Sequence, residues 1–219
     1  MARITHMPRR PQQAIDLEPL QLWEYTAIVP KLPYHWRLVY AILWESGIRI
    51  GEALRLTKKD LTQERCNKCL GTGRVSPQLA ICSDCRATGI AGGIWVNRLK
   101  KRKKPQRDFI PLPPSLVAAL HTYAALLPGQ KLFPYTTAGA WKALKVASAA
   151  GGVRRTMHPH LFRHGFTRTV AKKDLGLSPL DHMTLLARML GHSSIKQVES
   201  YFMPGMQEAA DTFRKMQGR

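Results

Sequence analysis

The sequence His-Leu-Phe-Arg-His at residues 160–164 is the stretch that decides the fold of this 219-residue chain. If the segment is helical, His160 and Arg163 are three residues apart and lie on one face of the helix. Taken alone, such a pair is equally compatible with an ordinary solvated helix face. Its meaning therefore depends on the segments that precede and follow it in the chain.

Two other segments carry residues that can work with this pair. Upstream, Ser46–Leu56 combines a tight turn with the start of a helix, where Arg49 stands. Downstream, Leu-Gly-His at residues 190–192 stands at a helix end, and Tyr201 follows His192 by nine residues. Each has an ordinary alternative: Arg49 as a surface ion pair, His192 as a helix-terminus residue, and Tyr201 as part of the core.

Taken together, the three segments resemble the catalytic domain of the tyrosine recombinase, or phage integrase, family. The family pattern is Gly-Leu-Arg-x-x-Glu, then His-x-Leu-Arg-His, then Leu-Gly-His followed by Tyr. This chain keeps the order and spacing, with Ile48 and Phe162 in place of two leucines. The resemblance covers residues 17–219 and implies a mainly α-helical fold with a small antiparallel β-sheet, an α+β class.

The resemblance also implies an activity. A member of this family is a site-specific DNA recombinase that cleaves and rejoins strands through a 3′-phosphotyrosyl intermediate, in DNA integration, excision, inversion or resolution. The catalytic residues that it implies here are Arg49, Lys103, His160, Arg163, His192 and Tyr201. Arginines suit this chemistry because a guanidinium grips non-bridging phosphate oxygens bidentately. His160 can accept the proton of the tyrosine nucleophile, whose phenol has a pKa of about 10 and is mostly un-ionised at neutral pH.

No acidic cluster suited to Mg²⁺ lies near these motifs, so the positive charge at the reacting phosphate must come from side chains. Because the phosphotyrosyl bond conserves the energy of the phosphodiester, neither ATP nor a catalytic metal is expected.

A run of basic residues, 98–107, lies between two strand-like segments, Gly93–Asn97 and Asp108–Leu112. This pattern predicts a β-hairpin with a basic tip, although a solvated loop or a localisation signal is the plainer alternative. Alignment of residues 110–112 with the Val-Pro-Leu strand of the family implies that Lys103 protonates the leaving 5′-oxygen. Lys101 and Lys104 are close rivals for that role.

The net charge points to a polyanionic partner. Lys and Arg number 34 against 14 Asp and Glu, a formal charge of +20, and residues 109–173 contain no acid. Double-stranded DNA fits this excess and the resemblance, while a ribosome-associated or merely basic protein is the alternative. The residues expected to contact DNA are Arg98, Lys100, Lys101, Arg102, Lys104, Arg107, Arg154 and Arg155. No apolar run or leader indicates a membrane or secreted protein, so a cytoplasmic, nucleoid-associated protein is expected.

All four cysteines fall into two Cys-x-x-Cys pairs, Cys66 with Cys69 and Cys82 with Cys85. This spacing predicts a closed, tetrahedral and structural zinc site, and zinc is the one cofactor expected. The pairs resemble the cysteine-rich modules of J-domain chaperones, with Ala87 replacing a glycine of the second copy. Two disulfides or a redox pair are the alternatives.

The predicted organisation is a flexible basic arm (1–16), a catalytic domain (17–219) and a zinc-binding insert within it (64–91). Most members of the family carry a further N-terminal core-binding domain, whereas about 16 residues precede the catalytic domain here. A minimal recombinase, a fragment, or an accessory protein that completes the DNA clamp would each account for this, and the insert could replace part of the clamp. Self-association on DNA, from dimer to tetramer, is expected, with residues 203–219 packing on a neighbouring protomer or in the chain's own core.

Two other functions compete with the recombinase. One is a non-cleaving, zinc-containing DNA-binding accessory or regulatory protein on the same fold. The other is a topoisomerase-like enzyme that relaxes DNA with the same chemistry. The complete set of catalytic residue types argues against the non-cleaving protein, which has no physical need for all of them.

Overall fold

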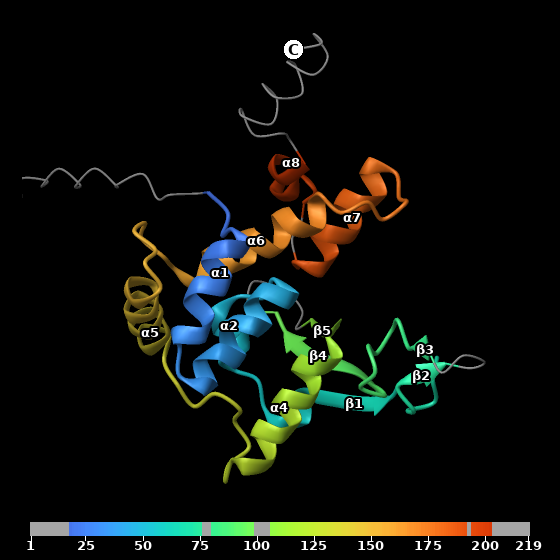
Figure 1. Cartoon of the computed structure of the whole chain (residues 1–219). Helices are drawn as coiled ribbons and strands as arrows, with labels where there is room; N and C mark the ends of the chain where they lie inside the picture. The colour runs from blue at the N-terminus through green and yellow to red at the C-terminus, as the bar shows by residue number, and fades with distance from the viewer. Residues whose placement is uncertain (1–17, 76–79, 99–105, 192–193, 203–219) are drawn as a thin grey trace, which may run out of the picture.

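Helix α2 (Tyr34–Ser46) forms the centre of the molecule because most of its side chains are apolar. Val39, Tyr40 and Leu43 are completely buried in the main core. The Tyr40 hydroxyl keeps a hydrogen-bond partner by donating to the carbonyl oxygen of Ala140, 2.8 Å away. The computed structural model describes residues 18–75, 80–98, 106–191 and 194–202. Figure 1 shows α2 between α6 (Pro159–Ala171) and α4 (Pro114–Leu126), and it packs against both.

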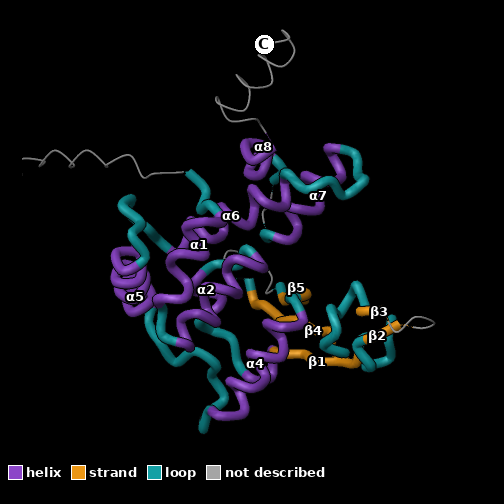
Figure 2. Tube along the Cα trace, viewed as in Figure 1, coloured by secondary structure: helices purple, strands orange, loops and turns teal. Residues whose placement is uncertain are grey.

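The five short strands follow one another in the described chain, with helices before and after them, in a helix-rich domain (Figure 2). The described elements are, in chain order, α1 (Leu22–Ile28), η1 (Val29–Lys31), α2 (Tyr34–Ser46), α3 (Ile50–Ala53), η2 (Lys58–Asp60), β1 (Leu61–Arg65), β2 (Arg74–Val75), β3 (Ala80–Ile81), β4 (Ile90–Asn97), β5 (Arg107–Pro111), α4 (Pro114–Leu126), α5 (Thr137–Ala150), α6 (Pro159–Ala171), α7 (Pro179–Met189) and α8 (Lys196–Phe202). This composition confirms the predicted fold class, a mainly α-helical domain with a small antiparallel sheet.

The sheet has the strand order β1-β4-β5, and all of its pairings are antiparallel. The predicted hairpin is therefore confirmed as β4 and β5, with Ile94 opposite Ile110. Strand residues alternate between two faces, and Ile94, Val96 and Ile110 are buried on the inner one. Helix α4 packs against β1 and β4.

A second, smaller apolar cluster joins α6, α7 and α8, and its buried members include Phe166, Leu186 and Val198. The end of α2 reaches this cluster at Gly47, whose φ of 64° is left-handed. A Cβ atom at Gly47 would lie 2.4 Å from a ring carbon of Phe166. Only glycine therefore fits at this junction, which lies directly before Arg49 in the chain.

The cysteine-rich segment lies beyond the end of β1, where β2 and β3 form a separate two-stranded ribbon (Figure 1). The last pair of the main sheet here is Arg65 with Ile90, so the segment between them is inserted into the β1–β4 connection. None of the helices in the described ranges has both the length and the apolar composition that a membrane crossing requires.

The first helix differs from its prediction. The residue pattern predicts a helix capped by Asp16, with Leu20, Trp23 and Ala27 on one face, but α1 begins at Leu22. Leu20 lies before this helix and is buried, whereas Trp23 within it is 60% exposed. Asp16, with the rest of the predicted arm, lies outside the described residues.

Candidate active site

Arg49 is positioned by the turn that connects α2 to α3. It is the N-cap residue of α3, and the Glu52 carboxylate accepts hydrogen bonds from its backbone N–H at 2.9 Å and from its Nη1 at 3.1 Å. Glu52 is fully buried, whereas the Arg49 side chain keeps 18% of its surface exposed. The buried acid therefore fixes the arginine at both ends and leaves part of the guanidinium open to a ligand.

Arg163 lies on α6 and is buried, with 3% of its surface exposed. Its Nη1 donates to the carbonyl oxygen of Gly47 at 2.5 Å, and its Nη2 donates to that of Leu190 at 2.8 Å. Burial, and then the charge of Arg49, lower the pKa of Arg163 to about 10. Arg163 is thus still cationic at neutral pH, and it joins α6 to the ends of α2 and α7.

Arg49, His160 and Arg163 line one open pocket of about 330 Å³. The other lining residues are Ile48, Ile50, Gly51, Thr137, Trp141 and Pro159, and none of the described residues that line it is acidic. Two guanidiniums and an imidazole without a carboxylate form a site for an anion such as a phosphodiester. The structure thus brings together three of the predicted catalytic residues from two distant segments.

His160 is exposed on α6, and its ring lies edge-on to that of His164 with centroids 4.5 Å apart. Partial desolvation, followed by the positive groups of His164 and Arg163, lowers the pKa of His160 to about 4. The imidazole is therefore neutral at pH 7, the form that can accept a proton.

Tyr201 lies on α8 and is half-buried against α6. Its hydroxyl contacts Nδ1 of His164, and the two rings stack with centroids 5.6 Å apart. Arg168 donates to the Tyr201 carbonyl oxygen at 2.7 Å, which fixes the backbone at this point. Burial raises the pKa of Tyr201, and the charge of Arg163 opposes this. Tyr201 is thus held beside the pocket, and it is not among the residues that line it.

Sequence reasoning missed His164 as a contact of the tyrosine. The signal was present in the quoted motif, because His164 is one helical turn beyond His160 and shares its face of α6. Glu52 was likewise quoted in the first motif without a role, although it is the residue that holds Arg49.

The remaining predicted catalytic residues, Lys103 and His192, lie outside the described residues. The same holds for four of the predicted DNA contacts, Lys100, Lys101, Arg102 and Lys104. Two other predicted contacts are on the described surface. Arg154 is exposed, and Arg107 lies 5.3 Å above the Trp95 ring and pairs with Asp60 at 2.9 Å.

The structure corrects the prediction that Arg98 contacts DNA. Only 2% of its side chain is exposed, and it forms an ion pair with Asp108 at 2.8 Å. The Arg98 guanidinium is thus engaged inside the protein, and its charge is not free for phosphates. Arg155 also has partners inside the protein, because its guanidinium binds Glu24 at 2.5 Å and the carbonyl oxygens of Glu18 and Pro19. Its side chain keeps 17% of its surface exposed, so its contact with DNA stays a prediction.

The four cysteines form one buried cluster. Their Sγ atoms all lie within 4.8 Å of one another, with Cys66 and Cys82 at 3.8 Å and Cys69 and Cys85 at 3.5 Å. All four are free thiols, which excludes the disulfide alternative in this structure. Tetrahedral zinc–thiolate bonds of about 2.3 Å separate neighbouring sulfurs by about 3.8 Å, so the donor set fits a zinc ion.

The two cysteine pairs are built alike, sixteen residues apart. Gly73 donates its N–H to Cys69 Sγ at 3.2 Å, and Gly89 donates to Cys85 Sγ at 3.3 Å. Ala87, which replaces the glycine of the first copy, adopts the left-handed φ of 71° that a glycine would take there. The second loop thus keeps the geometry of the first despite the substitution.

Comparison with known proteins agrees with this geometry. The chain belongs to the phage integrase family, whose sequence profile matches residues 17–208. The resemblance to this family is thereby confirmed. The chain is similar to the tyrosine recombinase XerD of Oceanobacillus iheyensis, with 26% identity over 175 residues. That match covers 78% of this chain and 50% of XerD, so the chain spans about half the length of this relative.

Solved structures show the same fold. XerH recombinase bound to its difH substrate, in a pre-cleavage complex, has a TM-score of 0.61 and 19% identity, over 89% of this chain and 53% of that one. The catalytic domain of bacteriophage HP1 integrase has a TM-score of 0.53 and 18% identity, over 89% of this chain and 94% of that one. At these identities the likeness establishes the fold, which is that of a recombinase catalytic domain.

Proposed function

We propose that the protein is a site-specific recombinase that cleaves and rejoins DNA through a 3′-phosphotyrosyl intermediate, without ATP or a catalytic metal. The observation that carries this proposal is the pocket in which Arg49, His160 and Arg163 meet. Membership of the phage integrase family and the likeness to DNA-bound XerH support it.

In the proposed reaction, Arg49 and Arg163 bind the non-bridging oxygens of the scissile phosphate and stabilise the charge that develops on them. The Tyr201 oxygen attacks phosphorus and its proton passes to the neutral imidazole of His160. The bond from phosphorus to the 5′-oxygen breaks, and Lys103 gives that oxygen a proton. His192 adds a hydrogen bond to the phosphate.

Tyr201 has to change position for this attack. Its hydroxyl contacts His164 in the described arrangement, outside the set of residues that line the pocket. We therefore infer that DNA binding releases the hydroxyl from His164 toward the phosphate.

A covalent-trapping experiment tests the proposed function. A library of nicked duplexes with randomised sequence, in which the cleaved strand loses a short fragment and cannot be rejoined, is incubated with the protein. We expect a DNA–protein adduct that survives denaturation for the wild type and none for Tyr201→Phe. No adduct at any sequence in the library would overturn the recombinase proposal and favour the non-cleaving accessory protein.

DNA and further copies of this chain are the proposed partners. A structure of lambda integrase is a dimer bound to a core site, and XerH was solved with DNA. We propose that this chain likewise assembles on double-stranded DNA as a dimer or tetramer. An accessory protein that completes the DNA clamp stays part of the proposal, and pull-down with a trapped adduct as bait tests it.

We also propose that Cys66, Cys69, Cys82 and Cys85 hold a structural zinc ion, because their sulfur geometry fits one and leaves no open position. The metal would link the two cysteine loops and thereby stabilise the insert. Elemental analysis of the purified protein should find one equivalent of zinc, which is lost in Cys66→Ser with Cys69→Ser. Metal-free protein with a fully folded insert would contradict this assignment.

A further inference from the structure

Arg98 directly follows β4 in a strongly basic run, yet its side chain is almost completely buried. Its backbone N–H donates to the carbonyl oxygen of Gln106 at 2.9 Å, so the residue also closes the stem of the β4–β5 hairpin. A buried arginine costs free energy unless its donors are matched by acceptors. The acceptors around Arg98 therefore show what it is for.

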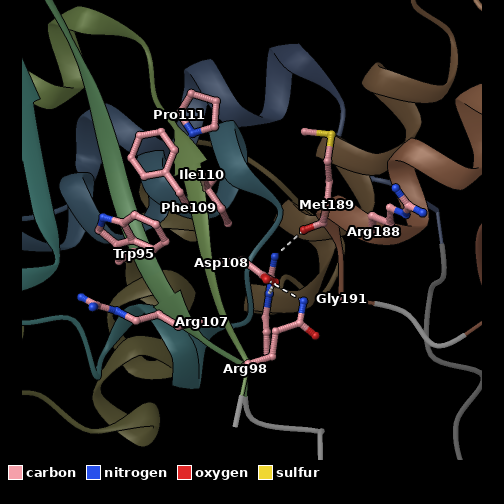
Figure 3. A pocket seen from close by; sticks show the side chains of 11 residues that line it. Trp95, Arg98, Arg107, Asp108, Phe109, Ile110, Pro111, Arg188, Met189 and Gly191 are labelled. Atoms are coloured by element: carbon pink, nitrogen blue, oxygen red, sulfur yellow. Dashed lines mark hydrogen bonds and ion pairs between the residues drawn. The ribbon is translucent and has the colours of Figure 1, made fainter. Parts of the chain in front are cut away.

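Three structural elements contact the Arg98 guanidinium. Its Nε donates to Asp108 Oδ2 on β5 at 2.8 Å, and its Nη2 donates to the carbonyl oxygen of Met189 at the end of α7 at 2.5 Å. Its Nη1 lies 3.6 Å from Glu52 Oε2 on α3, too far for a hydrogen bond. Figure 3 shows the guanidinium between β5 and the end of α7, with dashed lines to Asp108 and Met189.

Glu52 connects Arg98 to the pocket, because the same carboxylate binds both the backbone and the Nη1 of Arg49. The Glu52 carboxylate thus pairs with two arginines, Arg49 and Arg98. Without Arg98, only Arg49 of these two would remain to balance its charge. The acid would then hold the Arg49 guanidinium more strongly, at the expense of a phosphate in the pocket. Arg98 thus sets how much of the Arg49 charge is available.

Arg98 also helps to fix the end of α7. It binds the carbonyl oxygen of Met189, while Arg163 binds that of the next residue, Leu190. Gly191 packs directly on the Arg98 side chain, since a Cβ atom there would lie 3.2 Å from Arg98 Cδ. Two arginines therefore hold the consecutive carbonyls of Met189 and Leu190, which stand three and two residues before His192 in the sequence.

We propose that Arg98 is a positioning residue for the cleavage reaction, which acts through Glu52 on Arg49 and through Met189 on the end of α7. The inference rests on the proposed function, because it concerns the rate of a reaction at the arginine pocket. It assigns to Arg98 no contact with DNA.

The test compares Arg98→Met and Arg98→Lys with a matched control, Glu24→Gln. The control removes the acid of another buried arginine pair, Arg155 with Glu24, outside the pocket. Single-turnover cleavage at saturating nicked DNA from the trapping library gives the rate, and DNA titration gives the affinity. Thermal melting reports the fold of each variant.

We expect Arg98→Met to cleave about 100-fold more slowly than the wild type, the scale of a small displacement of catalytic groups. Its DNA affinity should stay within about threefold, because Arg98 touches no phosphate. Arg98→Lys keeps the positive charge, so it should melt near the wild-type temperature. A lysine ammonium cannot bind Asp108 and Met189 and also face Glu52 as the guanidinium does, so this variant should still cleave slowly. This variant keeps the test informative if Arg98→Met fails to fold.

A substrate with a methylphosphonate at the scissile position separates a positioning role of Arg98 from a purely structural one. A purely structural defect should slow cleavage of the neutral and the charged substrate alike. One non-bridging oxygen is replaced by a methyl group, so the phosphate is neutral and needs less stabilisation from Arg49. The cleavage defects of Arg98→Met and Arg49→Ala should then shrink together. If both Arg98 variants cleave like Glu24→Gln on charged DNA, the inference is overturned, whereas failure of the wild type to form any adduct overturns the proposed function itself.

Discussion

The arginine pocket and the cysteine cluster are assembled in opposite ways. The pocket unites Arg49 with His160 and Arg163, so it exists only when the core has brought α3 and α6 together. The cysteine cluster draws all four ligands from residues 66–85 and depends on two local loops. The first region should therefore fail whenever the fold is disturbed, while the second should fold and unfold with the proposed zinc ion.

The largest expected effect comes from removing an arginine of the pocket. Arg163→Ala removes a charge from the pocket and two hydrogen bonds to the ends of α2 and α7. We expect cleavage to fall by about 10³-fold or more, with a much smaller loss of DNA binding. Trapped-adduct assays and DNA titration on the same preparation measure the two quantities. Equal losses of rate and affinity would show that Arg163 serves binding alone.

Loss of the cysteine cluster should have the reverse signature. Removing zinc, by a chelator or by Cys66→Ser with Cys69→Ser, should unfold the insert and leave the main core intact. If the insert replaces part of the DNA clamp, affinity should fall by about 10-fold, or 1.4 kcal/mol, and the cleavage rate at saturating DNA should hold. Unchanged folding and unchanged affinity would exclude the insert from DNA binding.

His160, in the pocket, should make the stability of the folded protein depend on pH. The pKa of His160 is lowered to about 4 in the folded protein, from an ordinary value of 6.5. Between pH 4 and pH 6.5, His160 binds a proton in the unfolded chain but not in the folded one. Its contribution to the free energy of unfolding is therefore fully present above pH 6.5 and is lost as the pH falls toward 4. His160→Asn should lose less of its melting temperature between pH 7 and pH 5 than the wild type. An identical decline in both proteins would contradict the lowered pKa.

The smallest expected effect belongs to Lys100, a predicted DNA contact in the basic run 98–107. Lys100→Ala should weaken DNA binding slightly and reduce the slope of log affinity against log salt by about one unit. Its cleavage rate at saturating DNA should equal that of the wild type. Binding measured at several salt concentrations checks this, and a loss of rate would move Lys100 into the catalytic set.

Local patterns predicted most elements of the fold. The helix Pro114–Leu126 is an example, because the sequence itself marks both ends: Pro114 opens it, and the Pro-Gly pair at 128–129 cannot continue it. The β4–β5 hairpin followed from two strand-like segments around a basic run. The cysteine cluster was also readable, since the spacing within each pair already limits its geometry.

Arg98 and Tyr201 show what the sequence left open. Strand alternation would have placed Arg98 on the inner face with Ile94 and Val96, but its position in a basic run suggested a DNA contact instead. The contact of the Tyr201 hydroxyl with His164 depends on how α8 packs on α6, which no spacing within either helix determines.

The most direct test of the central claim is to map the covalent bond. After trapping on nicked DNA, digestion with nuclease and protease, and mass spectrometry, the account predicts a nucleotide attached through phosphate to the peptide that contains Tyr201. The same peptide should be unmodified in Arg163→Ala. A nucleotide on any other residue, or a wild-type protein that carries none, would contradict the account.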